Sequence, residues 1–423
     1  MKILVFYPYI PWPLNRGTYQ RTFHLLRELA KSHEVDLLAL SENGEGMEYK
    51  GIFEGFCRRV EFVSFQHPAW QKLFPTRLLN PLPPNVAHWT VPHVEQALVK
   101  MLTSENYDAV HACDIILAQY FMRKNRRIPL VIDRSRVDLQ FQLMEHSRMK
   151  FSARTKLLRC EGYLKLWFYE RAVARRAAME IVCGPDDETF LRRYVKQKMP
   201  ISVLVNGVDL EYFRPDASDE PRSAKPSLIF CGAMDYNPNI DALRWYFQEI
   251  HEPLRKLIPD LEVLIVGKAP SPEILALGTN PNVTVTGGVP DVRPYYRRAW
   301  LQMVPLRIGG GTRLKIVESL AMGTPVVSTT IGAQGLNLQH GKDILLADSG
   351  EDFVRETARA LRDLEMRNNL SKTGLNTARS RFSWTMLGCG LSAFYKTTFQ
   401  TFSGRSFCNP RSHIGRNRFA VNR

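Results

Sequence analysis

The sequence alternates short apolar segments with amphipathic helical patterns, and this alternation occurs twice along the chain. In the first half, the expected strands are residues 3–7, 35–40, 60–65, 109–111, 130–133, 180–183 and 202–205. In the second half, they are residues 228–231, 262–266, 283–286, 300–304, 326–328 and 344–346. Strands that alternate with helices favour parallel sheets wrapped by helices. Because 423 residues exceed what one core normally serves, we expect an α/β fold of two doubly wound domains facing each other across a cleft.

The composition changes between residues 206 and 227, where one glycine and three prolines occur without an apolar periodicity. Such a segment is typical of a connection between domains. We therefore assign residues 1–205 to an N-terminal domain and residues 228–383 to a C-terminal domain. Residues 384–400 predict a final helix that packs back on the N-terminal domain, and the polar, basic residues 401–423 predict no regular structure.

A glycine run leads into a helical pattern in the second half. Gly309, Gly310 and Gly311 allow the backbone to bend sharply and to approach a bound group closely. The helix expected from Thr312 to residue 322 presents free N–H groups and the positive end of its dipole. The run follows an expected strand, and ligands of doubly wound folds bind at the carboxyl ends of strands. The sequence therefore predicts an anion site here.

Two cations and one carboxylate accompany this helix start. Arg313 and Lys315 place positive charge in the expected first turn, which costs stability unless an anion binds there. Glu318 lies three residues after Lys315, so the two side chains share a helix face. Its carboxylate suits the hydroxyl groups of a sugar. A phosphorylated ligand that contains a sugar accounts for all three side chains.

The formal net charge is +15, and much of it lies in two segments. Basic residues outnumber acidic ones between Arg148 and Arg176, and no acidic residue follows Glu365. Such surfaces attract polyanions, whether nucleic acid, anionic lipid headgroups or a pyrophosphate-linked substrate. A solvated helix face together with a basic tail accounts for the same charge equally well.

Residues 66–89 contain five prolines together with Trp70, Phe74 and Trp89. Prolines exclude regular structure, and tryptophans favour the boundary between membrane and water. The segment therefore suggests contact with a membrane interface or a lipid-linked acceptor. A loop folded back on its own domain is the simpler alternative.

Targeting and metal-binding patterns are absent from the sequence. No apolar run approaches the roughly 20 residues of a membrane span, and the start does not form a signal peptide. The seven cysteines are scattered without metal-ligand spacing, and Asp186 and Asp187 are better explained as caps of an expected helix. We expect a cytoplasmic protein with peripheral contact to the anionic membrane face, and no bound metal or cofactor.

Four phrases occur in a fixed order along the chain. They are VNGVD at 205–209, FCGAMDYNPNID at 230–241, VTGGVPD at 285–291 and the glycine and helix block at 305–325. Together they resemble glycosyltransferase family 4. The resemblance implies the type B fold of two Rossmann-like domains, with the acceptor held mainly by the first domain and a nucleotide-sugar donor by the second. It also implies a retaining, metal-independent reaction, with polysaccharide or cell-envelope biosynthesis as its setting.

The resemblance implies roles for residues on the donor side. Glu318 matches the second glutamate of the Glu-x7-Glu motif, which contacts the nucleotide ribose. The first glutamate falls on Gly310, so backbone N–H groups or another side chain must hold the donor sugar. Gly287 and Val289 resemble the loop whose backbone contacts the base.

Two further positions depart from the pattern of many relatives. Ala233 and Pro238 stand where these relatives carry an arginine and a lysine. Arg313 and Lys315 are then implied to stabilise the leaving diphosphate, as catalytic cations that replace a metal ion.

On the acceptor side, Arg16 and Gly17 match the glycine loop near the donor phosphates. Family members often have a histidine after the strand at 130–133, and none is present here. Asp138 is the nearest carboxylate able to orient an acceptor hydroxyl. His111 resembles the Val-His-Ala phrase of the family, although a histidine at the end of a buried strand is more often a hydrogen-bonded core residue.

The sequence thus predicts a glycosyltransferase acting on a glycan, lipid-linked or other glycoconjugate acceptor, with no nucleic-acid partner. A nucleotide-sugar epimerase on the same fold is one alternative, but it needs acids around the sugar ring, and Gly310 removes one. A non-catalytic, basic binding protein is a second, favoured by Ala233 and Pro238 but disfavoured by the retained cations. A dehydrogenase is disfavoured because Gly-x-Gly-x-x-Gly is absent.

Overall fold

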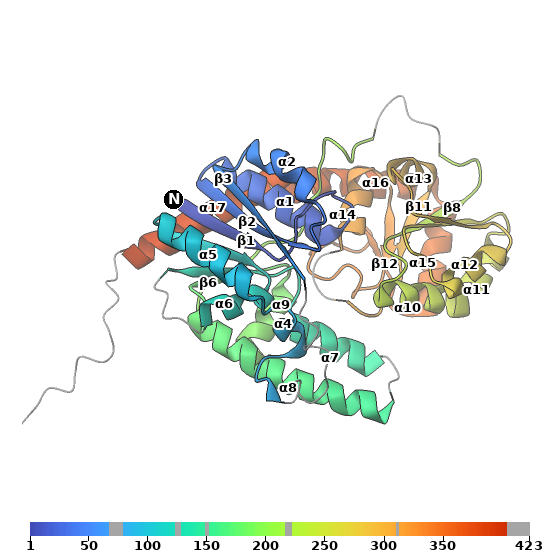
Figure 1. The fold of residues 1–423 in the computed structure, drawn as a ribbon. Coiled ribbons are helices and arrows are strands. Elements are labelled where there is room, and N and C mark those ends of the chain that lie inside the picture. The colour runs from blue at the N-terminus through green and yellow to red at the C-terminus, as the bar shows by residue number, and fades with distance from the viewer. Residues whose placement is uncertain (67–78, 123–127, 149–151, 216–221, 310–312, 404–423) are drawn as a thin grey trace, which may run out of the picture.

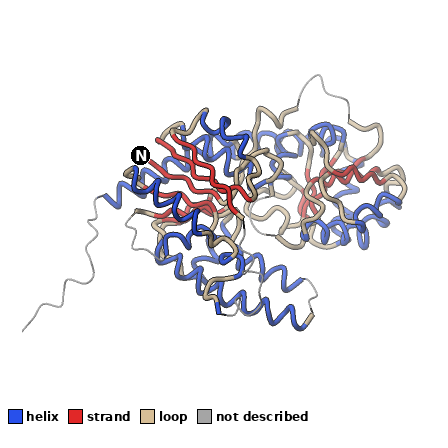
Figure 2. Tube along the Cα trace, viewed as in Figure 1, coloured by secondary structure: helices blue, strands red, loops and turns tan. Residues whose placement is uncertain are grey.

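The computed structural model describes residues 1–66, 79–122, 128–148, 152–215, 222–309 and 313–403. Two parallel sheets, each flanked by helices, lie side by side in these residues (Figure 1). In both halves of the chain, the strands lie in the interior and helices surround them (Figure 2). The expected α/β fold of two doubly wound domains is confirmed.

The N-terminal sheet has seven strands in the order β3-β2-β1-β4-β5-β6-β7, and every pairing is parallel. The strands are β1 (Lys2–Tyr7), β2 (Glu34–Glu42), β3 (Arg59–Phe65), β4 (Ala109–Cys113), β5 (Leu130–Asp133), β6 (Met179–Val182) and β7 (Ile201–Val203). The central strands β1, β4 and β5 are mostly apolar and almost entirely buried because helices cover both faces. The strand order reverses between β1 and β4, where doubly wound sheets bind ligands.

The C-terminal sheet has six parallel strands in the order β10-β9-β8-β11-β12-β13. They are β8 (Ser227–Cys231), β9 (Glu262–Val266), β10 (Val283–Gly287), β11 (Leu301–Val304), β12 (Val326–Ser328) and β13 (Leu345–Leu346). Here the order reverses between β8 and β11. The loop after β11 carries the glycine run, so the predicted anion site follows a central strand.

The helices follow the strands in the order expected for crossover connections. The N-terminal helices are α1 (Gly17–Ala30), α2 (Lys50–Glu54), α4 (Pro84–Ala87), α5 (Pro92–Ser104), α6 (Gln119–Met122), α7 (Asp138–Arg148), α8 (Ala153–Arg176) and α9 (Pro185–Phe190). The C-terminal helices are α10 (Asn237–Trp245), α11 (His251–Leu257), α12 (Pro272–Ala276), α13 (Arg293–Arg298), α14 (Leu314–Ala321), α15 (Gly350–Arg362), α16 (Leu364–Arg381) and α17 (Trp384–Ser403).

The last helix, α17, lies on the N-terminal domain. It packs along α1, and Trp384, Leu391 and Tyr395 belong to the same apolar core as the inner strands of the first sheet. The imidazole of His24 stacks on the indole of Trp384, with ring centroids 5.2 Å apart. The chain therefore crosses between the domains twice, once before β8 and once before α17.

Three helices of the C-terminal half have ends or breaks with a local cause. Helix α10 continues through a π-helical turn at Tyr246–Ile250 into α11. Helices α15 and α16 are separated at Asp363, whose carboxylate caps α16 by accepting from the Met366 N–H. The helix of the glycine block begins at Leu314, two residues later than expected.

Helices α7 and α8 pack together and extend along one edge of the N-terminal domain (Figure 1). Arg159 on α8 pairs with Glu145 on α7, and Tyr163 on α8 contacts His146 on α7. At 24 residues, α8 is the longest helix of the described chain. Among the described residues, no helix combines the length and the apolar character that crossing a bilayer requires.

Candidate active site between the two domains

The helices that follow β1 and β11 meet at the boundary between the domains. A Cβ atom added to Gly17, the first residue of α1, would lie 2.8 Å from Leu314 Cδ1, at the start of α14. Leu314 packs against the apolar cores of both domains. The two helix starts predicted to bind phosphate are therefore in contact.

Arg313 lies directly before α14, with extended backbone, and not in the first helical turn as the sequence suggested. Its guanidinium lies over Gly309, where a Cβ atom would be 2.0 Å from Nη2. A side chain at position 309 would therefore displace the Arg313 guanidinium. Burial lowers the pKa of Arg313, whereas the Tyr236 and Asp187 side chains raise it. The predicted ligand residues Gly310, Gly311 and Thr312 lie outside the described residues.

Lys315 extends from the first turn of α14 toward the end of β8. Its Nζ donates to Asn239 Oδ1 at 2.9 Å and lies 4.2 Å from the ring centroid of Phe230. A Cβ atom at Gly232 would come within 3.0 Å of Nζ. Burial and the positive charge of Arg313 lower the pKa of Lys315 to about 8. Burial therefore disfavours the charged form of both side chains, and Arg313 further disfavours the charged form of Lys315.

Glu318 lies one turn beyond Lys315 and is buried. Its Oε1 accepts from Gln20 Nε2 at 3.3 Å, and its Oε2 accepts from the Tyr296 hydroxyl at 3.3 Å. Burial raises the pKa of Glu318, and these two hydrogen bonds together with Lys315 act in the opposite direction. The carboxylate is thus held at the domain boundary, with one partner from each domain.

Further polar residues from both domains gather near α14. The pKa of Lys268 is lowered mainly by burial. The charge of Arg16, directly before α1, lowers this pKa further, and the charge of Asp235 raises it. Asp187, at the start of α9, is buried, which raises the pKa of its carboxyl to about 6 against the effect of Arg313. The predicted residue Arg16 therefore lies near cations of the opposite domain.

Several of these residues were not singled out from the sequence. Asn239 fixes the Lys315 ammonium group, and it occurs in the family-like phrase at 230–241, which was the available signal. Lys268 lies at the carboxyl edge of the sheet, directly after Gly267, the residue that follows β9. Gln20 and Tyr296 carry no local signal, because each meets Glu318 only through the tertiary fold.

The predicted base-binding residues lie at the carboxyl end of β10. Gly287 ends this strand with φ of +70°, a conformation that suits glycine. Its carbonyl oxygen accepts from the Gly267 N–H at 3.1 Å. Val289 packs at the edge of the C-terminal core. Both residues therefore lie along the same sheet edge as Lys268.

Asp138, the predicted acceptor carboxylate, begins α7. Its Oδ1 accepts from Arg136 Nε at 2.8 Å, and its Oδ2 accepts from Asn85 Nδ2 at 3.4 Å. The Asp114 carboxyl follows β4 nearby, and burial, reinforced by the charge of Asp138, raises its pKa to about 6. Phe141, one turn further along α7, stacks on Tyr236 of the C-terminal domain. Asp138 is therefore close to the domain boundary.

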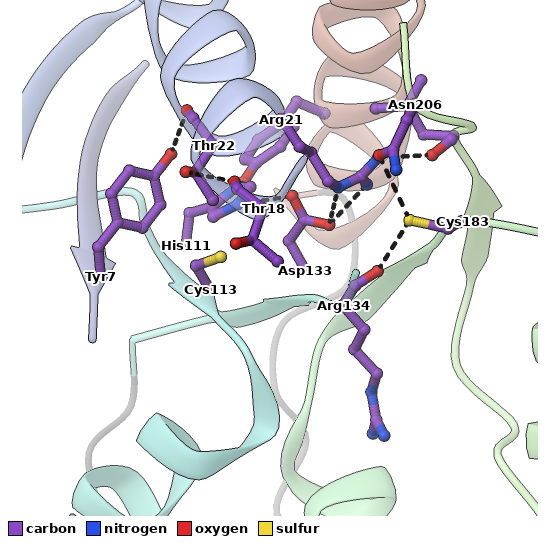
Figure 3. Close-up of polar contacts among 12 residues, drawn as sticks. Tyr7, Thr18, Arg21, Thr22, His111, Cys113, Asp133, Arg134, Cys183 and Asn206 are labelled. Carbon is purple, nitrogen blue, oxygen red and sulfur yellow. Dashed lines mark hydrogen bonds and ion pairs between the residues drawn. The ribbon is translucent and has the colours of Figure 1, made fainter. Parts of the chain in front are cut away.

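His111 lies inside the N-terminal domain, only 1% exposed (Figure 3). Its Nδ1 lies 2.7 Å from the Tyr395 hydroxyl, and its Nε2 lies 3.5 Å from Asp133 Oδ2. Asp133 also receives two hydrogen bonds from the buried guanidinium of Arg21. The structure thus places His111 in a buried polar cluster that links β4, β5, α1 and α17.

Arg21 connects this cluster to the segment between the domains (Figure 3). Its Nη1 donates to the Leu204 carbonyl at 2.8 Å and to Asn206 Oδ1 at 3.1 Å. Its Nη2 also forms an ion pair with Asp133 Oδ1, at 2.7 Å.

The proline and aromatic segment is only partly described. Trp70 and Phe74 lie outside the described residues. Trp89 is half-buried and packs on the N-terminal core, with its ring centroid 5.4 Å from that of Phe65. For this tryptophan, the structure agrees with a segment folded back on its own domain.

In the described parts of the chain, no group of three or more His, Cys, Asp or Glu side chains is arranged to hold a metal ion. The charged groups that meet at the boundary are instead Arg313, Lys315 and Glu318, together with Arg16 and Lys268 from the adjoining loops. Cations and a carboxylate at one domain boundary suit a ligand with several negative charges and hydroxyl groups.

Known proteins match both halves of the chain. The family described as glycosyl transferase 4-like domain matches residues 16–207, and the family described as glycosyl transferases group 1 matches residues 225–364. D-inositol 3-phosphate glycosyltransferase 1 of Catenulispora acidiphila is 31% identical over 221 residues, which cover 47% of this chain and 52% of that protein.

Solved structures match nearly the whole chain. Sucrose-phosphate synthase from Thermosynechococcus elongatus aligns with a TM-score of 0.71 and 18% identity, covering 96% of this chain and all of that one. Alr3699/HepE of Anabaena, in complex with UDP and glucose, aligns with a TM-score of 0.61 and 16% identity, covering 94% of this chain and all of the other. These likenesses confirm the expected type B arrangement of two Rossmann-like domains.

Proposed function

The chain belongs to the glycosyltransferases, with a glycosyl transferase 4-like domain followed by a group 1 domain, and on this premise we propose that it uses a nucleotide-diphosphate sugar. The sugar passes to a glycan, lipid-linked or other glycoconjugate acceptor, with retention of anomeric configuration. The setting we propose is polysaccharide or cell-envelope biosynthesis in the cytoplasm.

The observation that carries this proposal is the pair of cations at the start of α14. Burial lowers the pKa of both Arg313 and Lys315, and the positive charge of Arg313 lowers the pKa of Lys315 further. Such a pair is unfavourable in the free protein and becomes favourable when an anion binds between the domains. A diphosphate has the charge and the size to contact both groups.

Glu318 complements this anion site. Its carboxylate lies one turn beyond Lys315 on the same helix and accepts hydrogen bonds in the structure. We assign to it the hydroxyl groups of the donor ribose. At position 310, a glycine supplies no carboxylate for the donor sugar, so we assign the sugar to backbone N–H groups of the loop before α14.

In the proposed reaction, the bond between the anomeric carbon and the diphosphate oxygen breaks as negative charge grows on the leaving group. Arg313 and Lys315 stabilise that charge, and no metal ion is needed in this role. The acceptor hydroxyl attacks from the face that the diphosphate leaves, and its proton passes to the departing phosphate oxygen. Asp138 orients the acceptor hydroxyl from the N-terminal side.

We infer the acceptor's location and the membrane contact from the positive charge of the chain. We propose that a lipid-linked or glycan acceptor reaches the N-terminal domain at the cytoplasmic face of an anionic membrane. No nucleic-acid partner is required to account for the cations at the domain boundary, because the diphosphate engages them.

A donor-hydrolysis assay tests the proposal. The chain is incubated with UDP, GDP and ADP sugars, and released nucleoside diphosphate and free sugar are measured together with the anomer first formed. We expect release from one class of donor, with retention, and losses of about a hundredfold in Arg313→Ala and Lys315→Ala, since one such donor contributes roughly 3 kcal/mol. Unchanged turnover in both variants would refute these roles, and an epimerised nucleotide sugar would support the epimerase instead.

A further inference from the structure

Helix α8 presents an apolar stripe to solvent. Leu157, Leu164 and Phe168 are 73%, 58% and 59% exposed. They are spaced by seven and four residues, close to two turns and one turn, so they line one side of the helix. We call these three residues the α8 stripe. Isolated exposed apolar residues are ordinary, but an aligned set on one helix is typical of a binding surface.

Cations accompany the stripe. Arg175 follows Leu157 by five full turns and continues the same line, while Arg154 and Lys156 are exposed beside its beginning. The acidic residues of α8 do not offset this charge. Glu161 pairs with Lys165 at 2.5 Å, and Glu170 is fully buried beside Arg134.

The turn at Leu191–Val195 extends this surface. Trp167 Nε1 on α8 donates to the Tyr194 carbonyl at 3.1 Å, which places the turn against the helix. Tyr194 is 49% exposed, and the Arg193 guanidinium lies 5.3 Å from its ring centroid. The guanidinium of Arg171 lies 4.8 Å from the Trp167 ring. Aromatic rings and cations are thus interleaved across the helix and the turn.

Charge decides between the occupants of such a surface. A second copy of this face would bring like charges together, which costs energy. An anionic bilayer accepts all three components, because aliphatic side chains enter its interface, tryptophan and tyrosine rings favour that depth, and lysine and arginine meet its headgroups.

We propose that the exposed face of α8, with the turn at Leu191–Val195, docks the chain on an anionic membrane surface. This assignment rests on the proposed function for its setting, and it specifies which face meets the membrane. Helix α7, which packs on α8, begins at Asp138, so a docked α8 holds the proposed acceptor residue near the lipid. A lipid-linked acceptor then reaches the site without leaving the interface.

Vesicle co-sedimentation of the full chain tests the proposal. The probes are vesicles of phosphatidylcholine alone and of phosphatidylcholine mixed with phosphatidylglycerol, at low and high salt. We expect binding to the mixed vesicles, weakened by salt. The double variants Leu164→Ser with Phe168→Ser, and Lys156→Glu with Arg175→Glu, should each bind about tenfold or more weakly, since one cation near an anionic surface contributes roughly fivefold.

Matched controls lie on the C-terminal domain. Leu275→Ser with Leu364→Ser removes two leucines of similar exposure, 53% and 61%, and Lys225→Glu with Lys256→Glu makes the same change in net charge. Both controls should bind vesicles as the unaltered chain does. Equal losses in controls and α8 variants, or binding to RNA but not to vesicles, would overturn the proposal.

Nucleoside diphosphate binding, followed by thermal shift, separates this test from the proposed function. The α8 variants should keep the stabilisation that UDP or GDP gives the unaltered chain. If no nucleotide binds the unaltered chain, the donor assignment fails while the vesicle result still decides the docking face.

Discussion

Gln20 Nε2 donates a hydrogen bond to Glu318 Oε1 at 3.3 Å, joining α1 of the N-terminal domain to α14 of the C-terminal domain. Gln20 Nε2 also donates to the Leu14 carbonyl at 3.3 Å. The carboxylate that we assign to the donor ribose therefore accepts a hydrogen bond across the domain boundary. Ribose hydroxyl groups must compete with this amide or share the oxygen with it.

Replacing Gln20 by Ala should raise the affinity for the preferred nucleoside diphosphate by about two- to fivefold, because a competing hydrogen bond of on the order of 0.5–1 kcal/mol is removed. Isothermal calorimetry measures this change. Tyr296→Phe is the contrasting variant, because the Tyr296 hydroxyl holds the other oxygen, Oε2, from within the same domain and so orients the carboxylate, and its loss should weaken binding. Weaker binding in Gln20→Ala would show that the amide supports the ligand instead of competing with it.

The affinity for a nucleoside diphosphate should fall as pH rises from 7 to 9. The pKa of Lys315 is lowered to about 8 in the free protein, so its ammonium group is mostly protonated at pH 7 and mostly neutral at pH 9. Above pH 8, the dissociation constant should rise by up to about tenfold per pH unit. Calorimetry across this range measures the slope, and Lys315→Arg should remove most of it. A flat profile for the unaltered chain would contradict the assigned role of Lys315.

Two glycines of α17 offer a matched test of its packing on α1. A Cβ atom at Gly388 would lie 2.3 Å from Glu28 Cβ, whereas nothing lies within 4 Å of one at Gly390. Gly388→Ala should therefore lower the free energy of unfolding by roughly 1–3 kcal/mol. Gly390→Ala should raise it by up to about 1 kcal/mol through helix propensity. Urea unfolding measures both changes, and equal effects would contradict the close contact between the two helices.

The ion pair of Arg21 and Asp133 should be essential for stability. Arg21→Ala leaves a buried carboxylate without its cation, and we expect a loss of about 3–5 kcal/mol in the free energy of unfolding. Arg255→Ala, which breaks an exposed pair with Glu252, should leave the free energy of unfolding almost unchanged, because solvent screens such pairs. A similarly small loss in Arg21→Ala, measured by urea unfolding, would show that the pair is dispensable.

The same pair predicts how stability depends on acid. Burial raises the pKa of Asp133, but Arg21 and His111 outweigh this effect and lower it to about 2. Because the folded pKa lies below the unfolded one, this contribution is present above pH ~4 and is lost as pH falls through about 2. Acid unfolding curves of Asp133→Asn should lack this component. An unchanged acid transition would contradict the low pKa.

The strands were predictable because buried parallel strands are short, continuously apolar and separated by helical patterns. Residues 262–266 and 326–328 were placed at the observed bounds. Helix ends were less predictable. The residues at 310–315 favour a helix start, yet Arg313 is extended, with its guanidinium packed against Gly309, and this contact is not visible in local propensity.

The candidate site was predictable where a local pattern carries the chemistry. Arg313, Lys315 and Glu318 fall within six residues, so their shared helix reveals them. Gln20 could not be found in this way, because its partner is 298 residues away. The same holds for Arg21, since arginine is rarely buried and its partners come from β5 and from the connection at Leu204 and Asn206.

The central claim is that Arg313 and Lys315 hold the diphosphate of a nucleotide sugar between the two domains. Calorimetric titration of the unaltered chain and of Lys315→Ala with UDP, GDP and ADP tests it most directly, with Lys256→Ala as a control that removes an exposed lysine of the C-terminal domain. We predict that one of the three nucleotides binds the unaltered chain and Lys256→Ala equally, and binds Lys315→Ala about a hundredfold more weakly. Equal affinity in all three proteins, or no binding of any of the three nucleotides to the unaltered chain, would contradict it.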